Sequence, residues 1–191
     1  MCKNKLPCYE KRNRNNLVMR KIYLPLTKDV VSSLKIGDEL LLSGTIYTAR
    51  DAAHKRLCEL ISKNKKLPID IDGVVIYYCG PAPAKKNKPI GSCGPTTSKR
   101  MDSFTPALLS KGMAAMIGKG RRSKDVIASI KNNKGVYFIA IGGAGAYLAD
   151  RVKRSELICY KDLEPEAIYK LWVEDFPVVV GIDSKGNSIF K

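Results

Sequence analysis

The apolar and polar positions of the chain follow two periods, one typical of strands and one typical of helices. Apolar residues alternate with polar ones over Val18–Leu24 and the pattern stops at Pro25, which predicts a strand. Gly73–Cys79 is almost entirely apolar or aromatic, as expected for a strand covered on both faces. The strands predicted in this way are residues 18–24, 39–43, 73–79, 114–117 and 136–141.

Helical spacing and capping residues predict helices between these strands. Thr48 is followed three residues later by Asp51, a capping-box variant, and the helix that begins there runs to about Lys63. Thr27 and Ser123 are hydroxyl caps for two further helices. The predicted helices are residues 27–34, 51–63, 105–112, 123–132, 146–152 and 166–173, followed by a hairpin of 178–182 with 188–190.

The order of these elements predicts a mixed α/β fold, in which a mixed sheet forms the core and helices flank it. A length of 191 residues with 45% hydrophobic content suits one domain. Residues 1–16 are polar and basic and are expected to form a tail, which leaves 17–191 as a single domain. There is no apolar run of about 18 residues and no signal-peptide core near Met1, so we expect a soluble cytoplasmic protein that makes no membrane contact.

The charge of the chain indicates an anionic partner. Thirty-four Lys and Arg residues against 18 Asp and Glu give a formal charge of +16. Nucleic acid is one candidate, but the cations are spread in short clusters, aromatic residues make up only 7%, and no known recognition motif accompanies them. A nucleic-acid-binding module is therefore the alternative of another class, while an acidic protein or a small anionic substrate stays open.

The cysteines argue against a metal site built by this chain alone. The six cysteines form no C-x-x-C pair, and the single histidine, His54, has no cysteine at zinc-finger spacing. In a cytoplasmic protein they are expected to be free thiols. His54 shares a helical face with apolar residues, so a structural role is favoured over acid-base catalysis.

Three glycine-containing segments carry the candidate chemistry. In Gly91–Asp102, glycines and a proline permit a tight turn whose backbone N–H groups could face one anion, beside hydroxyl groups and the planar fork of Arg100. Arg50 lies where a strand turns into a helix, next to free N–H groups. Lys119 stands between two glycines after a strand, without the spacing of a Walker A loop. The alternatives are an ordinary turn and solvent-facing cations.

Taken together, these segments resemble the β subunit of class I fumarases, which is the C-terminal domain of the single-chain enzymes. Tartrate dehydratase β subunits share the motifs. The resemblance covers essentially residues 17–191, in matching order. It is carried by Gly37-Asp38, Ser43–Arg56, Gly94–Thr97, Arg100–Asp102, Ile117–Gly120 and Gly142–Ala146.

The resemblance implies a swivelling β/β/α domain of three layers that acts in the reversible hydration of fumarate to (S)-malate. The alternative within the class is an L(+)-tartrate or other hydroxy-diacid dehydratase. In this family a separate α subunit holds a 4Fe-4S cluster, so the implied partners are that subunit and a small dicarboxylate substrate. The implied assembly is a hetero-oligomer such as a heterotetramer, in which this chain binds no cluster itself and is inactive alone.

The resemblance also implies roles for individual residues. Arg50, Arg100 and Lys119 match the groups that hold the substrate carboxylates, and Thr96 matches the catalytic base. Cations fixed where charge develops would stabilise the doubly charged aci-carboxylate formed by proton removal. A threonine hydroxyl needs such cations to act as a base, so Thr97 or a residue of the other subunit stays open for this role. The candidate supporting residues are Asp51, His54, Thr97 and Asp102.

Overall fold

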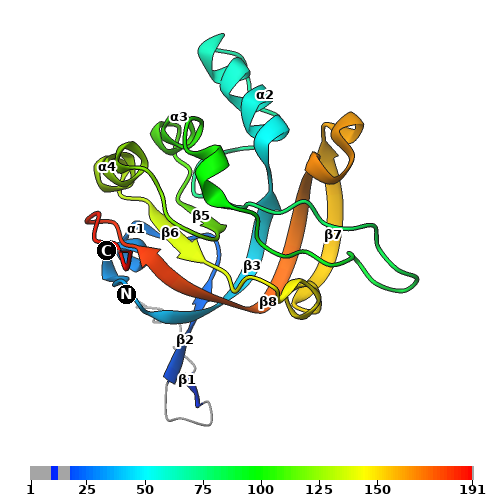
Figure 1. The fold of residues 1–191 in the computed structure, drawn as a ribbon, viewed down its shortest axis with the longest axis horizontal. Coiled ribbons are helices and arrows are strands. Elements are labelled where there is room, and N and C mark those ends of the chain that lie inside the picture. Colours follow the sequence, from blue (N-terminus) through cyan, green and yellow to red (C-terminus); the bar gives the residue numbers. More distant parts are fainter. Residues whose placement is uncertain (1–9, 13–17, 191) are drawn as a thin grey trace, which may run out of the picture.

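The computed structural model describes residues 10–12 and 18–190, and its strands form one sheet that curls back on itself (Figure 1). Pairings run from β3 through β4, β5 and β6 to β8, and β8 pairs in turn with β3, which closes a ring of five strands. The strands are β1 (Glu10–Arg12), β2 (Val18–Tyr23), β3 (Glu39–Thr48), β4 (Val75–Tyr77), β5 (Ala115–Gly118), β6 (Val136–Ile139), β7 (Val152–Cys159) and β8 (Ile168–Ile182).

The sheet is mixed, as predicted from the sequence. β2 to β6 pair in parallel along the order β2-β3-β4-β5-β6. β8 is antiparallel to each of its neighbours β3, β6 and β7, and its register with β3 extends from Val179 opposite Glu39 to Lys170 opposite Tyr47. The fold class predicted from the sequence, a mixed α/β domain with flanking helices, is confirmed.

Two hydrophobic cores lie on the two faces of the sheet, because successive side chains of a strand point to opposite sides. Val75 and Tyr77 of β4 belong to the core enclosed by the curled sheet. Ile76 and the following Tyr78 belong to the second core, which lies between the sheet and the helices.

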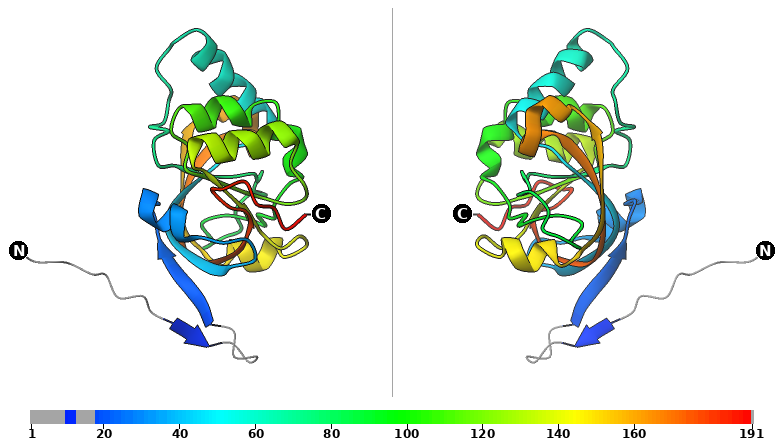
Figure 2. Two further views of the ribbon diagram at one scale, coloured as in Figure 1. Left: turned by 90° about the vertical axis from the view of Figure 1, so that its left-hand side faces the viewer. Right: turned by 90° about the vertical axis from the view of Figure 1, so that its right-hand side faces the viewer.

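The helices cover the sheet unevenly. Figure 2 shows α3 and α4 side by side on one side of the sheet with α2 beyond them, whereas α1 and α5 lie on the other side. The helices are α1 (Lys28–Ser33), α2 (Asp51–Ser62), α3 (Thr105–Ser110), α4 (Lys124–Asn133) and α5 (Gly145–Ala149), with short 3-10 helices η1 (Ser98–Met101) and η2 (Lys161–Glu166). Residues of α1 and α5 belong to the first core and residues of α2, α3 and α4 to the second.

The predicted helix over 166–173 is wrong. Those residues belong to η2 and to the long strand β8, which continues through the first arm of the predicted hairpin. Ile168 and Leu171 are both buried at a helical spacing of three, but β8 is held as a strand because β3 and β7 pair with it on its two edges. The sequence pattern does not predict β7, since half of the residues of this strand are polar and half are exposed.

The predicted capping of α2 by Thr48 is also wrong. β3 extends beyond the predicted 39–43 and includes Thr48, whose hydroxyl donates to the carbonyl of Ala167 at 3.3 Å and accepts the N–H of Tyr169 at 3.1 Å. The residue at the N-cap is Arg50, without a side-chain capping bond. The first turn of α2 is instead available to other groups.

Part of the predicted tail is structured. Glu10–Arg12 form β1 and pair antiparallel with the start of β2. Residues 1–9 and 13–16 of that tail, with Cys2 and Cys8, lie outside the described residues. Within the part of the chain that the structure describes, no helix is long and apolar enough to cross a membrane.

Candidate active site

Arg50 lies half-buried where β3 turns into α2. Its Nη2 is 3.3 Å from Oε1 of Glu166, and the other oxygen of that carboxylate accepts the N–H of Ala52 in the first turn of α2 at 2.8 Å. A Cβ added at Gly80 would come within 2.7 Å of Nη1 of Arg50. Gly80 therefore leaves the space that the guanidinium fills, and Glu166 occupies the positive end of the helix beside it.

One carboxylate connects the two arginines predicted from the sequence. Oδ2 of Asp51 is 3.4 Å from Nη1 of Arg100 and 3.8 Å from Nε of Arg50. Arg100, on η1, also donates a hydrogen bond through Nη2 to the hydroxyl of Thr96. Residues that are far apart in the sequence therefore form a continuous series of contacts, which runs from Arg50 through Asp51 and Arg100 to Thr96.

Lys119 joins this group through its backbone. It directly follows β5, and it pairs with Thr97 in an isolated parallel bridge. Its side chain lies near the glycine-rich turn, because a Cβ added at Gly142 would be 3.7 Å from its Cδ. Thr97, Arg100 and Lys119 are exposed, whereas Thr96 is half-buried. The backbone bridge therefore brings Lys119 next to the segment that carries Thr96 and Arg100.

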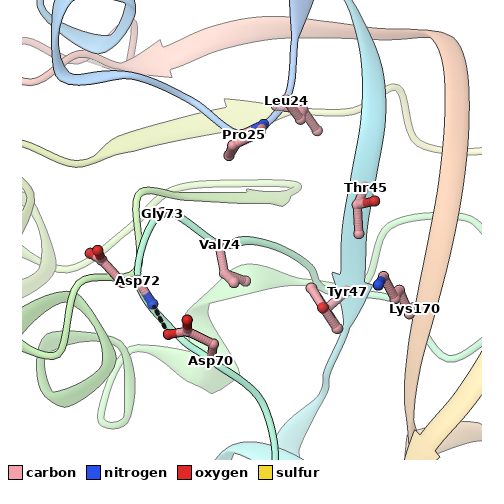
Figure 3. Close-up of a pocket in the computed structure, with 9 residues that line it drawn as sticks. All are labelled: Leu24, Pro25, Thr45, Tyr47, Asp70, Asp72, Gly73, Val74 and Lys170. Carbon is pink, nitrogen blue, oxygen red and sulfur yellow. Dashed lines mark hydrogen bonds between the residues drawn. The ribbon is translucent and has the colours of Figure 1, made fainter.

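A cleft of about 650 Å³ opens at Arg100, and Arg50, Thr96 and Lys119 are not among its lining residues. Asp51, Arg100 and Glu166 line it together with Phe104. A second cavity, of about 260 Å³, lies elsewhere and has Tyr47, Asp70 and Lys170 among its polar lining residues (Figure 3). That cavity contains none of the residues predicted for the site, whereas the larger cleft contains Asp51 and Arg100.

The predicted anion cradle of backbone N–H groups in Gly91–Asp102 is wrong for much of the segment. The N–H of Thr96 donates to the carbonyl of Tyr78 at 2.8 Å, and the N–H of Ser98 donates to that of Lys119 at 3.0 Å. The N–H groups of Gly91 and Cys93 are likewise bonded to carbonyls. The segment can therefore present side chains to a ligand, while these backbone donors hold it in place.

His54 lies fully buried behind Arg50. Its Nδ1 is 2.8 Å from the carbonyl oxygen of Arg50, to which it donates when that nitrogen carries the proton. Burial is the main cause that lowers the pKa of His54 to about 4; the positive charge of Arg122 acts in the same direction, and the bond to Arg50 acts against them. The ring is therefore neutral at pH 7 and supports the backbone of Arg50 rather than binding an anion.

Asp102 forms an ion pair with Arg122, an arginine that the sequence analysis does not assign to the site. Its Oδ1 accepts from Nε of Arg122 at 2.7 Å, and its Oδ2 accepts the N–H of Ser123 at 2.6 Å. The side chain of Arg122 is 0% exposed, and its guanidinium lies 5.0 Å from the ring centre of Tyr137. Arg122 belongs to one of the short clusters of cations in the sequence, and its neighbour Arg121 is exposed.

Three of the four thiols among the described residues have a raised pKa, which makes them poor metal ligands. A hydrogen bond to Cys93 and burial both raise the pKa of Cys79, and burial raises the pKa of Cys159 to about 11 and that of Cys58 above its usual value. No group of three His, Cys, Asp or Glu residues that could hold a metal ion occurs within residues 10–12 and 18–190. The described residues of this chain therefore do not fit an iron-sulfur cluster.

Comparisons with known proteins relate the chain to one family. The model of the Fumarase C-terminus family matches residues 2–191. The chain is 43% identical over 163 residues to the anaerobic class I fumarate hydratase of Escherichia coli K12, which covers 84% of the chain and 30% of that enzyme. It is 40% identical over 172 residues to the putative L(+)-tartrate dehydratase subunit beta of Methanocaldococcus jannaschii, which covers 87% of the chain and 88% of that protein.

A eukaryotic fumarate hydratase also matches most of this chain with only part of its own length. The mitochondrial fumarate hydratase 1 of Leishmania major is 39% identical over 170 residues, which is 88% of this chain and 31% of that enzyme. The chain therefore spans about a third of the length of the fumarate hydratases it matches, and most of the length of the tartrate dehydratase subunit.

Proposed function

The chain belongs to the Fumarase C-terminus family, whose named relatives are hydro-lyases, and we propose that it is the β subunit of an enzyme that hydrates fumarate reversibly to (S)-malate. The observation that carries the proposal is the position of Asp51 between the guanidinium groups of Arg50 and Arg100. Two cations held this closely, beside a cleft, suit a substrate that has a carboxylate at each end.

Two of the chain's own carboxylates contact the arginines that we propose to bind the substrate. Glu166 contacts both Arg50 and the first turn of α2, and Asp51 contacts both arginines. These contacts keep the guanidinium groups oriented when no diacid is bound. A substrate would then add its carboxylates to the remaining N–H groups of the two arginines, of which Arg100 lines the cleft.

Thr96 is the proposed base, because Arg100 donates a hydrogen bond to its hydroxyl oxygen. In the dehydration direction, a positive donor at that oxygen stabilises the Thr96 alkoxide, which takes a proton from the carbon of (S)-malate and becomes the hydroxyl. In the hydration direction the hydroxyl returns that proton to the carbon. The second negative charge that then develops on the neighbouring carboxylate would be stabilised by Arg100 and Lys119. Each such contact is expected to contribute about 2 to 4 kcal/mol to the transition state.

The proposed partner is an α subunit that carries a 4Fe-4S cluster. The match to 88% of a protein named subunit beta supports a multi-subunit enzyme, and the exposed face of Arg100, Thr97 and Lys119 offers a surface for a second chain to cover. Because the described thiols of this chain do not fit the cluster, we assign it to that subunit. The chain is then inactive alone, and the assembly is a hetero-oligomer such as a heterotetramer.

The second candidate substrate is L(+)-tartrate or another hydroxy-diacid. One relative favours this candidate. It is named a putative L(+)-tartrate dehydratase subunit beta, and the match covers 88% of that protein. The same three cations would hold either diacid, so the contacts within this chain do not separate the two.

The test is an assay of the assembled enzyme with a set of diacids. The chain is co-produced with the candidate α subunit from the same organism, the cluster is reconstituted without oxygen, and fumarate, (S)-malate and both tartrate enantiomers are compared. Fumarate hydration by the complex, absent from either chain alone, supports the proposal. Turnover of tartrate only would select the second candidate, and no turnover of any diacid would reject both.

A further inference from the structure

Ser98 lies midway between Thr96 and Arg100, and its side chain is buried. Its N–H donates to the carbonyl oxygen of Lys119 at 3.0 Å, and its Oγ accepts the N–H of Lys119 at 3.0 Å. Both backbone polar groups of Lys119 are therefore bonded to this one serine. The position of Lys119 relative to the Thr96–Arg100 segment depends on Ser98.

Ser98 and Gly118 fit each other closely. A Cβ added at Gly118 would lie 1.9 Å from Oγ of Ser98 and 3.0 Å from a ring carbon of Tyr78. The hydroxyl group therefore fills the space that any larger residue at 118 would need. The end of β5, immediately before Lys119, is shaped around this serine.

The hydroxyl group of Tyr137 supports Ser98. Its proton is shared between two acceptors, Oγ of Ser98 at 3.0 Å and the carbonyl oxygen of Gly120 at 2.9 Å. Oγ of Ser98 therefore accepts from both the N–H of Lys119 and the hydroxyl of Tyr137. Tyr137 thus connects Ser98 to Gly120, the residue that follows Lys119.

Buried groups hold Tyr137 in this place. The guanidinium of Arg122 stacks on its ring at 5.0 Å and is fixed by Asp102 at 2.7 Å. Burial raises the pKa of Tyr137 to about 12, so the hydroxyl keeps its proton at neutral pH and can donate to Gly120. Arg122 and Tyr137 therefore support the turn at Lys119 from its buried side.

We propose that Ser98 is a positioning residue, whose hydroxyl group holds Lys119 at a fixed place relative to Thr96 and Arg100. Its consequence for catalysis rests on the proposed function, because Lys119 matters there as a cation at the reacting carboxylate. The structural part of the proposal, the hold on the Lys119 backbone, can be measured on the chain itself.

The first experiment measures amide hydrogen exchange by NMR on the isolated chain. Ser98→Ala removes the acceptor of the Lys119 N–H, so exchange at that amide is expected to become about tenfold faster. Ser129→Ala, which alters a buried serine of α4 away from the site, is the matched control and leaves the Lys119 amide unchanged. If Ser98→Ala does not fold, Tyr137→Phe is the second variant, expected to give a smaller increase of about threefold because only the supporting bond is lost.

The second experiment is a double-mutant cycle on the assembled enzyme. Ser98→Ala is expected to lower kcat/KM about tenfold or more when Lys119 is present, since small misplacements of a binding group are costly. In the Lys119→Ala variant, Ser98→Ala should lower kcat/KM less than about twofold, because Ser98 acts through that lysine. A general loss of structure would instead lower activity equally in both backgrounds.

The outcomes separate this inference from the proposed function. Equal losses in both backgrounds, or a Lys119 amide that exchanges no faster in Ser98→Ala, would overturn the positioning role. If the assembled enzyme converts no diacid at all, the proposed function fails, and the exchange measurement alone then decides whether Ser98 holds Lys119.

Discussion

Oδ2 of Asp51, the first residue of α2, lies 3.4 Å from Nη1 of Arg100 on η1. This contact joins two segments that are far apart in the sequence, and each of them carries an arginine predicted to bind a carboxylate. The proposed diacid site requires this convergence, because neither segment alone supplies a cation for each end of the substrate.

Arg100 is predicted to be essential for turnover but not for folding. Arg100→Ala in the assembled enzyme should lower kcat about 10² to 10³-fold, because a donor to the developing charge is lost. Since the side chain is 46% exposed, the melting temperature of the variant should stay close to that of the wild type. Lys99→Ala, on the same turn of η1 and also exposed, is the control, and an equal loss in that variant would show that the effect is one of general charge.

Gly80 is predicted to be required for the position of Arg50. Gly80→Ala places a methyl group 2.7 Å from Nη1 of Arg50, so the guanidinium must move and activity should fall about tenfold or more. Gly142→Ala, whose Cβ would make only an ordinary 3.7 Å contact with Lys119, should have a much smaller effect. The measurement is kcat/KM of the two variants under the same conditions. Similar values for both would argue against the role of Gly80 in positioning Arg50.

His54 is predicted to make the fold sensitive to acid. Its pKa is about 4 in the folded chain and near 6.5 when unfolded, so the unfolded chain binds more protons between these values. The stability that neutral His54 contributes is complete above about pH 6.5 and is lost as the pH falls toward 4, an effect of about 3 kcal/mol.

The measurement is the free energy of unfolding by urea between pH 4 and pH 7. His54→Asn, whose amide nitrogen can replace Nδ1 as donor to Arg50, should show a shallower fall over this range even if it is less stable overall. An unchanged slope would mean that other groups cause the acid sensitivity.

Arg122 is predicted to be one of the most sensitive positions for stability. Arg122→Ala leaves the carboxylate of Asp102 largely buried without its partner, which is expected to cost about 3 to 5 kcal/mol in the free energy of unfolding. Arg121→Ala, the exposed neighbour, should change it by less than about 0.5 kcal/mol. Equal effects in chemical denaturation would show that the ion pair of Arg122 contributes little.

The sequence predicts the parts of the site that follow buried strands. The apolar runs of β3, β4 and β5 are recognisable in the sequence, and Arg50 and Lys119 lie where two of these strands end. That these ends meet follows from the parallel pairing of the strands, which brings their carboxyl ends to one edge of the sheet. The resemblance to class I fumarases then selects Thr96 and Arg100 within the segment that follows β4.

The supporting residues could not be predicted in the same way. Glu166 contacts Arg50 only because β8 pairs with β3, and the local pattern around it indicates a helix instead. Nothing in the dipeptide Arg121-Arg122 distinguishes the buried residue from the exposed one. Burial of Arg122 is decided by Asp102 and by two tyrosines on other segments, which is information that lies in the tertiary structure.

An experimental structure of the assembled enzyme with a bound C4 diacid would decide whether the three cations share one substrate. We expect carboxylate oxygens within about 3.2 Å of guanidinium nitrogens of Arg50 and Arg100 and of Nζ of Lys119, with Oγ1 of Thr96 facing a substrate carbon. A diacid bound away from these groups, for example in the cavity of Tyr47 and Lys170, or a Lys119 side chain pointing out of the shared pocket, would show that the proposed site is wrong.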